Sequence, residues 1–216
     1  RDRYVETGQH QLVMMSGAPT PVLLIPGWSD TARVLRPCHE FLVSAGWPER
    51  SVYSLSFRDR HGSNLDHAAE IGAAARALKA STGVARIAVI AHSMGGLALR
   101  AYLTQGGDAI VHTAIFAGTP HRGTWLAWLA WGPGGAEMRP GSAFLVRLNA
   151  TPVPPSVRVI CLRTPIDTRV VPGRSAWLEG ADCHTVRLPT HPRMLRHGAT
   201  LQLIRSLLLD EETRAA

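Results

Sequence analysis

The chain has 216 residues and a formal net charge of +7, with 45% hydrophobic and 18% charged residues. This balance is typical of a globular chain that can bury one sizeable core, and it excludes an intrinsically disordered protein. No apolar run approaches the ~18 residues that suggest a transmembrane segment. The basic residues are scattered instead of forming a stripe, so we expect no nucleic-acid partner and only a weak attraction to anionic surfaces.

We expect a single domain over residues 1–216, with its core at about 20–210, and a monomer. The chain opens on Arg1-Asp2-Arg3-Tyr4, without an initiator Met or a signal-peptide pattern. This start indicates a trimmed N-terminus and favours a secreted mature chain over a cytoplasmic one.

The cysteines are Cys38, Cys161 and Cys183, and their spacing does not suggest a metal site. Three cysteines cannot all pair within one chain. Cys161 lies in an apolar strand pattern, where cysteine is usually a small core residue. A Cys161–Cys183 disulfide is conceivable if the strands that carry the two residues are neighbours, and the sequence leaves this open.

Predicted strands and helices alternate along the first half of the chain. A strand at 21–25 runs into the turn Pro26-Gly27, and a helix at 31–45 is closed by Gly46. The following elements are a strand at 51–57, a helix at 65–79 with Asn64 as its N-cap, a strand at 85–91 and a helix at 97–104.

The same alternation continues, in the order strand 111–117, Trp-rich stretch 124–131, Gly/Pro-rich loop 132–141, short helix 144–148, strands 157–162 and 183–188, and final helix 192–209. Strands separated by helices predict βαβ units. The fold class is therefore α/β, with a mostly parallel central sheet and helices on both faces.

The segment Ala91-His92-Ser93-Met94-Gly95-Gly96 joins a predicted strand to a predicted helix. It matches the nucleophile turn of α/β-hydrolases, with Ala91 where Gly is more usual. Such a turn lifts the serine hydroxyl above the sheet, and the residues two before and two after it must be small. A small-x-Ser-x-small match is common by chance, but the flanking strand and helix favour Ser93 as nucleophile. The N–H of Met94 would then donate to a developing oxyanion.

A serine nucleophile needs a histidine base that a carboxylate orients. In α/β-hydrolases these groups follow in the order Ser, Asp or Glu, His, which leaves His184, His191 and His197. His184 falls within a predicted strand, and His197 falls about two turns into the predicted final helix. His191 lies in the loop between these elements. We expect His191 as the base, with His197 and then His184 as alternatives.

Asp167 lies in the loop just past the predicted strand at 157–162, where a strand's C-terminal end meets the site. Asp182 and Glu179 precede the last predicted strand and would lie at the opposite edge of the sheet. We therefore expect Asp167 as the acid of the triad. The plainer interpretation is a turn residue that forms an Asx turn.

A second oxyanion donor is expected in the loop after the first strand. Pro26-Gly27-Trp28 fits this place, because Gly27 allows close backbone approach and the N–H of Trp28 can donate. The alternative is a plain turn.

These residues resemble those of bacterial lipases and esterases of the α/β-hydrolase superfamily, over about Pro21 to Leu209. Besides Ser93-Met94, the similar segments are Gly118-Thr119-Pro120-His121-Arg122-Gly123, Asp167 with Val170-Val171-Pro172, and His191 with Met194-Leu195. The resemblance implies an α/β-hydrolase fold and ester hydrolysis. Pro26 stands where many members have His, which leaves the subfamily open. His121 precedes the acid, so we interpret it as a loop or cleft residue.

Trp125 and Trp128 would share one face of a helix in the Trp-rich stretch. They could form a substrate-binding wall or small lid, or they could be ordinary core, and the sequence does not decide. Only about 25 residues (124–149) are available for a lid. We therefore expect a compact form with minimal cover and a preference for short to medium acyl chains.

The expected function is that of a serine carboxylic-ester hydrolase, an esterase or lipase, with a Ser93–Asp167–His191 triad and an acyl-enzyme intermediate. The expected partner is a small-molecule or lipid ester, and neither a cofactor nor a metal ion is expected. Two alternatives stay open: a serine hydrolase of amide, thioester or polyester bonds, and a non-catalytic α/β-fold binding protein.

Overall fold

The computed structural model describes residues 19–187 and 189–215, with side chains up to residue 210. In this part of the chain one sheet has six strands in the order β2-β1-β3-β4-β5-β6, and every neighbouring pair is parallel. The strands are β1 (Val22–Ile25), β2 (Val52–Ser54), β3 (Ile87–His92), β4 (Val111–Ala117), β5 (Arg158–Arg163) and β6 (Asp182–Thr185). The predicted parallel sheet is thereby confirmed.

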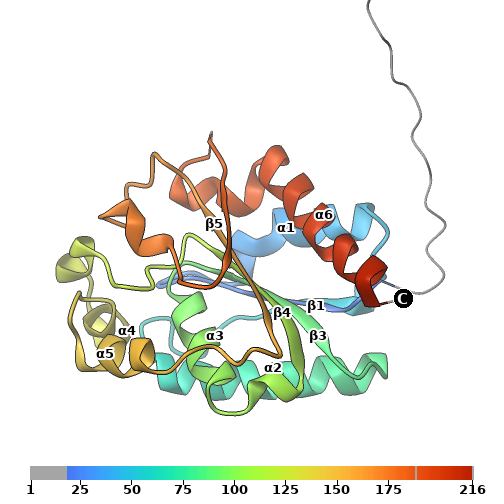
Figure 1. Cartoon of the computed structure of the whole chain (residues 1–216), viewed down its shortest axis with the longest axis horizontal. Helices are drawn as coiled ribbons and strands as arrows, with labels where there is room; N and C mark the ends of the chain where they lie inside the picture. Colours follow the sequence, from blue (N-terminus) through green and yellow to red (C-terminus); the bar gives the residue numbers. More distant parts are fainter. Residues whose placement is uncertain (1–18, 188, 216) are drawn as a thin grey trace, which may run out of the picture.

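Helices cover both faces of this sheet (Figure 1). The helices are α1 (Ala32–Ser44), α2 (Asn64–Thr82), α3 (Gly95–Leu103), α4 (Gly132–Glu137), α5 (Ala143–Ala150) and α6 (Gly198–Ala215). One apolar cluster joins the sheet to α1 and α6, and another joins it to α2 and α3. β1 and β3 are buried along their whole length, which explains why their sequences are continuous apolar runs.

The strand order reverses between β1 and β3. The chain moves outward from β1 to β2 and then returns to place β3 on the other side of β1. In open parallel sheets a crevice forms at such a point, outside the carboxyl ends of the two strands. The segments that follow β1 and β3 are the predicted oxyanion turn and the predicted nucleophile turn.

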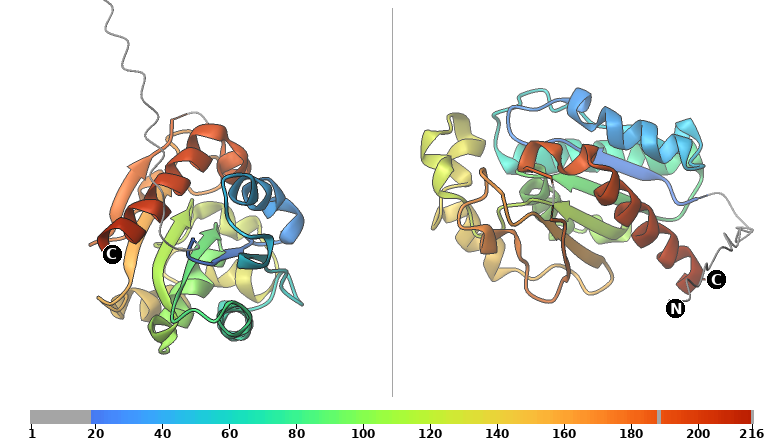
Figure 2. Two further views of the ribbon diagram at one scale, coloured as in Figure 1. Left: turned by 90° about the vertical axis from the view of Figure 1, so that its right-hand side faces the viewer. Right: turned by 90° about the horizontal axis from the view of Figure 1, so that it is seen from above.

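The second half of the chain adds α4 and α5 at one end of the sheet, away from the C-terminus (Figures 1 and 2). The segment 132–141, predicted as a loop, is in part helical, since it contains α4. The proline in the first turn of α4 is compatible with a helix start. A Cβ on Gly134 would lie 2.8 Å from the Met94 sulfur, so α4 packs directly beside the nucleophile turn.

Two helix starts differ from the prediction. α2 is capped by the hydroxyl of Ser63, which accepts from the N–H of Asp66, whereas Asn64 is the first helical residue and donates to the Glu137 carboxylate. The predicted final helix at 192–209 divides into a short 3₁₀ helix (His191–Arg196) and α6, which begins at Gly198. Extended backbone at His197 separates the two and ends the first helix.

Cys161 and Cys183 lie opposite each other on the neighbouring strands β5 and β6. Both thiols are free, as is that of Cys38, so the disulfide that the sequence left open is not formed. β6 ends at Thr185, and the last residue of the predicted strand, Leu188, lies outside the described residues.

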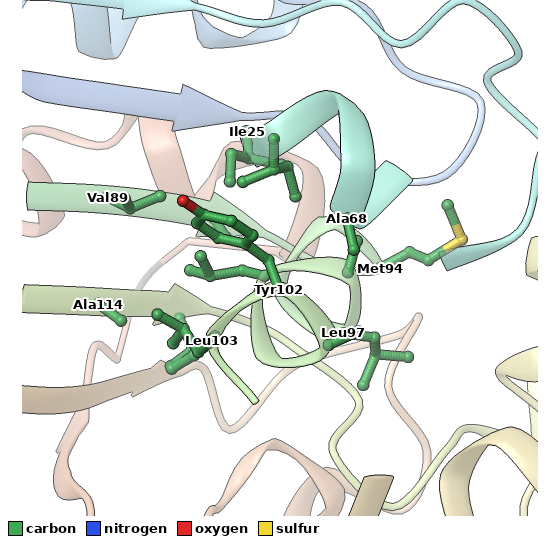
Figure 3. Close-up of a cluster of buried hydrophobic side chains, with 14 of the residues drawn as sticks. Ile25, Ala68, Val89, Met94, Leu97, Tyr102, Leu103 and Ala114 are labelled. Carbon is green, nitrogen blue, oxygen red and sulfur yellow. The ribbon is translucent and has the colours of Figure 1, made fainter. Parts of the chain in front are cut away.

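Figure 3 shows the apolar cluster between the sheet and the helices α2 and α3, into which Met94 and Leu97 project. This packing anchors the residue next to Ser93. No helix within 19–187 and 189–215 is both long enough and apolar enough to span a membrane.

Candidate active site

Ser93 lies in the turn between β3 and α3 with a φ of 53°, in the left-handed region that non-glycine residues rarely adopt. Its backbone N–H donates to the carbonyl of Ala117 at the end of β4 (2.9 Å). Such strain persists only where the surroundings fix it, and it is common at reactive serines.

The two glycines after Met94 allow this turn to pack against backbone. A Cβ on Gly95 would collide with the carbonyl oxygen of Pro26, and a Cβ on Gly96 would collide with the Thr119 side chain. The helix that follows Ser93 therefore lies directly against the loop after β1 and the loop after β4.

His191 Nδ1 lies 2.8 Å from Asp167 Oδ2, and their side chains are only 5% and 3% exposed. The other carboxylate oxygen of Asp167 accepts from the backbone N–H groups of Arg169 and Val170, both at 2.8 Å. Burial alone would raise the pKa of Asp167. The hydrogen bond and charge of His191, together with these two N–H groups, outweigh burial and lower the pKa. Asp167 is therefore held ionised beside His191.

The other two histidine candidates lie elsewhere. His184 is on β6, where its Nε2 lies 3.1 Å from the carboxylate of Asp182 on the same strand. His197 follows the 3₁₀ helix and precedes α6, instead of lying two turns into a helix as predicted. Of the three, the structure brings His191 to the cleft that Ser93 lines.

Two backbone N–H groups flank Ser93. A Cβ on Gly27 would lie 3.0 Å from Ser93 Cβ, which brings the loop after β1 against the serine. In the described part of the chain neither the N–H of Trp28 nor that of Met94 donates a hydrogen bond. Both groups are thus free to donate to a bound ligand.

The cleft over Ser93 has a volume of about 540 Å³. Toward the α4 end its walls are apolar and consist of residues that include Leu126, Ala127, Leu129, Ala130, Trp131 and Met138. Trp131 packs edge-on against Trp28, with ring centroids 4.7 Å apart, and its carbonyl accepts from Trp28 Nε1.

Trp125 and Trp128, which the sequence analysis assigned to the substrate site, do not line this cleft. Their stretch is a 3₁₀ helix (Trp125–Leu129) with three residues per turn, which keeps both indoles on one outward face. They are 62% and 63% exposed, so the alternative of core packing is also wrong. Trp128 instead lies under the guanidinium of Arg139.

Polar cleft residues that the sequence analysis did not predict include Asp30, Arg169 and His92. Burial raises the pKa of Asp30, although the charges of His191, Arg169 and Arg60 oppose this effect. Asp30 lies three residues after the oxyanion turn and Arg169 two after Asp167. Proximity to these motifs was the available signal, but it does not reveal which side chains face inward.

The expectation that His121 lies in a loop or the cleft is met only in its first part. His121 follows β4 in a turn and is buried, but it lines a second cavity and not the cleft over Ser93.

Comparison with known proteins agrees with this architecture. Residues 19–122, which hold β1 to β4 and the nucleophile turn, match the model of the family described as lipase (class 2). The chain has the α/β-hydrolase fold.

Several solved structures share the fold at low sequence identity. The mature lipase BlEst2 of Bacillus licheniformis matches with a TM-score of 0.78 and 16% identity, over 88% of this chain and 92% of that one. Lipase B of Aspergillus fumigatus matches with a TM-score of 0.75 and 20% identity, over 88% and 52%. A gene product of Listeria innocua matches at 0.68 and 15%, over 88% and 94%. These neighbours show the fold, and the family match over the first half of the chain is to a lipase model.

Proposed function

We propose that the protein is a serine carboxylic-ester hydrolase in which Ser93 is the nucleophile, His191 the base and Asp167 the acid. The observation that carries the proposal is the buried 2.8 Å contact between His191 and Asp167 at the cleft that holds the strained Ser93. A buried carboxylate–imidazole pair beside a serine in this turn is the arrangement that activates a hydroxyl.

His191 Nε2 takes the proton of the Ser93 hydroxyl as the oxygen attacks the ester carbonyl. Asp167 holds His191 with Nδ1 protonated and stabilises the imidazolium that forms. His191 then returns the proton to the leaving alcohol and later activates the water that releases the acid. Because Asp167 is held ionised, this stabilisation is available at neutral pH.

The N–H groups of Trp28 and Met94 form the proposed oxyanion hole. They come from the loops after β1 and β3, on either side of the strand reversal, and neither has a hydrogen-bond partner in the described structure. Removal of one such donor typically costs ~10²–10³-fold in kcat.

We propose that the acyl chain lies along the apolar wall that ends at Trp131, and that the substrates are small-molecule or lipid esters of short to medium chain length. The segment between β4 and β5 contains only short helices, which are the 3₁₀ helix at Trp125–Leu129, α4 and α5. The mechanism that we propose requires no cofactor and no metal ion.

The test is covalent labelling with a fluorophosphonate, followed by mass spectrometry of the modified peptide. We expect the wild type and Ser206→Ala to be labelled at Ser93, and Ser93→Ala to be unlabelled and inactive on p-nitrophenyl butyrate. Ser206 lies on α6, away from the cleft, and is the matched control. Labelling of Ser93→Ala, or activity above a few per cent in this folded variant, would disprove the assignment.

The same triad would serve amide, thioester or polyester substrates, which we keep as the second candidate. An acyl-enzyme forms from each of these substrates, so labelling does not tell them apart. The preferred bond type is found by comparing kcat/KM for a p-nitrophenyl ester, a p-nitrophenyl thioester and a p-nitroanilide of the same acyl group. A non-catalytic binding protein would give no labelling at Ser93.

A further inference from the structure

A second cavity of about 620 Å³ lies beyond β5, separate from the cleft over Ser93. Its walls combine the proline-rich segment 151–155 with Val157 and Val159 of the β5 region and the segment 177–180. The polar residues that line it are Arg100, His121, Arg122, Asn149 and Thr151, with Glu179 as the one acidic residue among them.

Arg100 is a buried charge in the wall of this cavity. It extends from α3, is only 2% exposed, and donates to the side-chain oxygen of Asn149 (2.9 Å) and the carbonyl of Leu148 (3.0 Å). Burial lowers the pKa of Arg100 to about 10, so the guanidinium is still charged at neutral pH. Its Nε has no hydrogen-bond partner in the described structure.

No carboxylate of the described residues forms an ion pair with Arg100, and both its partners are neutral. A buried charge without a counter-charge is rare, because the attraction that would offset its desolvation is missing. His121, on the same wall, is also buried and has an Nδ1 without a partner. Arg122 adds an exposed positive charge.

We propose that this cavity binds a small organic carboxylate, with its anionic group near Arg100 and its apolar body against the proline and valine walls. A guanidinium matches the planar carboxylate better than it matches a spherical anion. Val153, Val157, Val159, Leu178 and the Trp177 ring offer apolar contact for an aliphatic chain. This site is independent of the triad.

The direct test is isothermal titration of the full chain with hexanoate at pH 7. Hexanamide serves as the neutral isostere and inorganic phosphate as the anion without an apolar body. We expect hexanoate to bind saturably, about tenfold or more tighter than hexanamide, because charge-assisted hydrogen bonds are lost in the amide. Equal binding of hexanamide or of phosphate would overturn the proposal.

Asn149→Asp is the informative variant, because it places a carboxylate on the atom that now accepts from Arg100. It should supply the missing counter-charge and weaken hexanoate binding at least tenfold, although it also removes the Nδ2 group that donates to the carbonyl of His121 (3.1 Å). Gln105→Glu adds the same charge at an exposed position outside the cavity and should leave the affinity unchanged. Unchanged affinity in Asn149→Asp, or an equal loss in Gln105→Glu, would contradict the site.

Hexanoate could also occupy the cleft over Ser93, so the location is tested separately. Crystals soaked with 6-bromohexanoate should give an anomalous bromine peak between Trp177 and Val159. A peak only in the cleft would overturn the second site and leave the proposed hydrolase function untouched. Failure of the fluorophosphonate to label Ser93 in the wild type would overturn the proposed hydrolase function and leave the second site untouched.

Discussion

His92 Nε2 lies 3.1 Å from the backbone carbonyl oxygen of His191, and the two rings are 4.8 Å apart. A carbonyl can only accept, so Nε2 of His92 carries the proton, and this N–H ties the proposed base to the residue before the proposed nucleophile. Burial, followed by the charge of His191, lowers the pKa of His92 to about 3. His92 therefore stays neutral when His191 becomes an imidazolium.

This depressed pKa predicts a loss of stability in acid. The unfolded chain protonates His92 below its ordinary value of 6.5, whereas the folded protein does so only near 3. The free energy of unfolding should therefore fall as the pH decreases through this window. His92→Gln should reduce the fall between pH 7 and pH 4.5, measured by guanidinium unfolding. His121, Asp30 and Asp167 are present in both proteins, so their effects cancel in the comparison. The same fall in the free energy of unfolding in both proteins would contradict the assignment to His92.

The base is tested by a pair of histidine variants. His191→Ala should lose activity to the same extent as Ser93→Ala, because the residues of a triad act as a unit. His197→Ala should keep most activity, because His197 lies after the 3₁₀ helix and does not line the cleft. The readout is kcat/KM on p-nitrophenyl butyrate. The reverse pattern would move the base to His197.

Asp167→Asn should lower kcat by about 10⁴-fold, the cost of the wrong histidine tautomer in another triad. It should also change acid stability. The folded pKa of Asp167 lies below the ordinary value of 3.8, so its contribution to stability is present above that pH and is lost as pH falls through the folded pKa. The free energy of unfolding should therefore depend less on pH between pH 5 and pH 2 in Asp167→Asn than in the wild type. A stronger dependence in the variant would show that burial raises the pKa of Asp167 above its ordinary value.

Gly96→Ala should reduce expression of folded protein or destabilise it by several kcal/mol, because the new Cβ collides with Thr119. Gly198→Ala is the matched control at the start of α6, where a Cβ meets nothing within 4 Å. It should be neutral or stabilising by about 0.4–1 kcal/mol. Thermal unfolding of both variants checks the contrast, and equal unfolding temperatures would be inconsistent with the close packing of α3.

The acyl wall is tested by two tryptophans that are equally exposed. Trp131→Ala enlarges the apolar end of the cleft and should raise kcat/KM for longer p-nitrophenyl esters relative to shorter ones. One methylene contact in such a pocket is worth about 1–3 kcal/mol, so the change is measurable. Trp125→Ala should leave the chain-length profile unchanged, because Trp125 lies outside the cleft. Equal profiles for both variants would place the acyl chain elsewhere.

The sequence located the features that depend on neighbouring residues in the chain. Ser93, Asp167 and His191 each follow a strand, so the alternation of apolar runs was enough to predict that their segments meet at one edge of a parallel sheet. The N-cap of α2 is Ser63 and not the predicted Asn64. The prediction is wrong by one residue, because either side chain can cap a helix.

Other features depend on contacts between distant segments and could not be predicted in this way. The outward direction of Trp125 and Trp128 is set by a 3₁₀ helix that is held at its start by a distant segment. The N–H of Trp125 donates to the carbonyl of Val171, and the hydroxyl of the N-cap Thr124 donates to the carbonyl of Arg169 and accepts from the N–H of Val171. The polar cleft residues and the unpaired charge of Arg100 likewise result from packing among several elements, which no local pattern encodes.

The absence of a Cβ at Gly95 lets the backbone of Pro26 rest on the start of α3, so the two N–H groups at Trp28 and Met94 belong to one rigid block. The apolar wall of the cleft comes from the segment between β4 and β5, at residues 126–138. Under the proposed function, chemistry and selectivity thus reside in separable parts of the chain. Directed evolution for new substrates should accept changes mainly at 124–149, and libraries that vary 26–28 or 93–96 should yield mostly inactive clones.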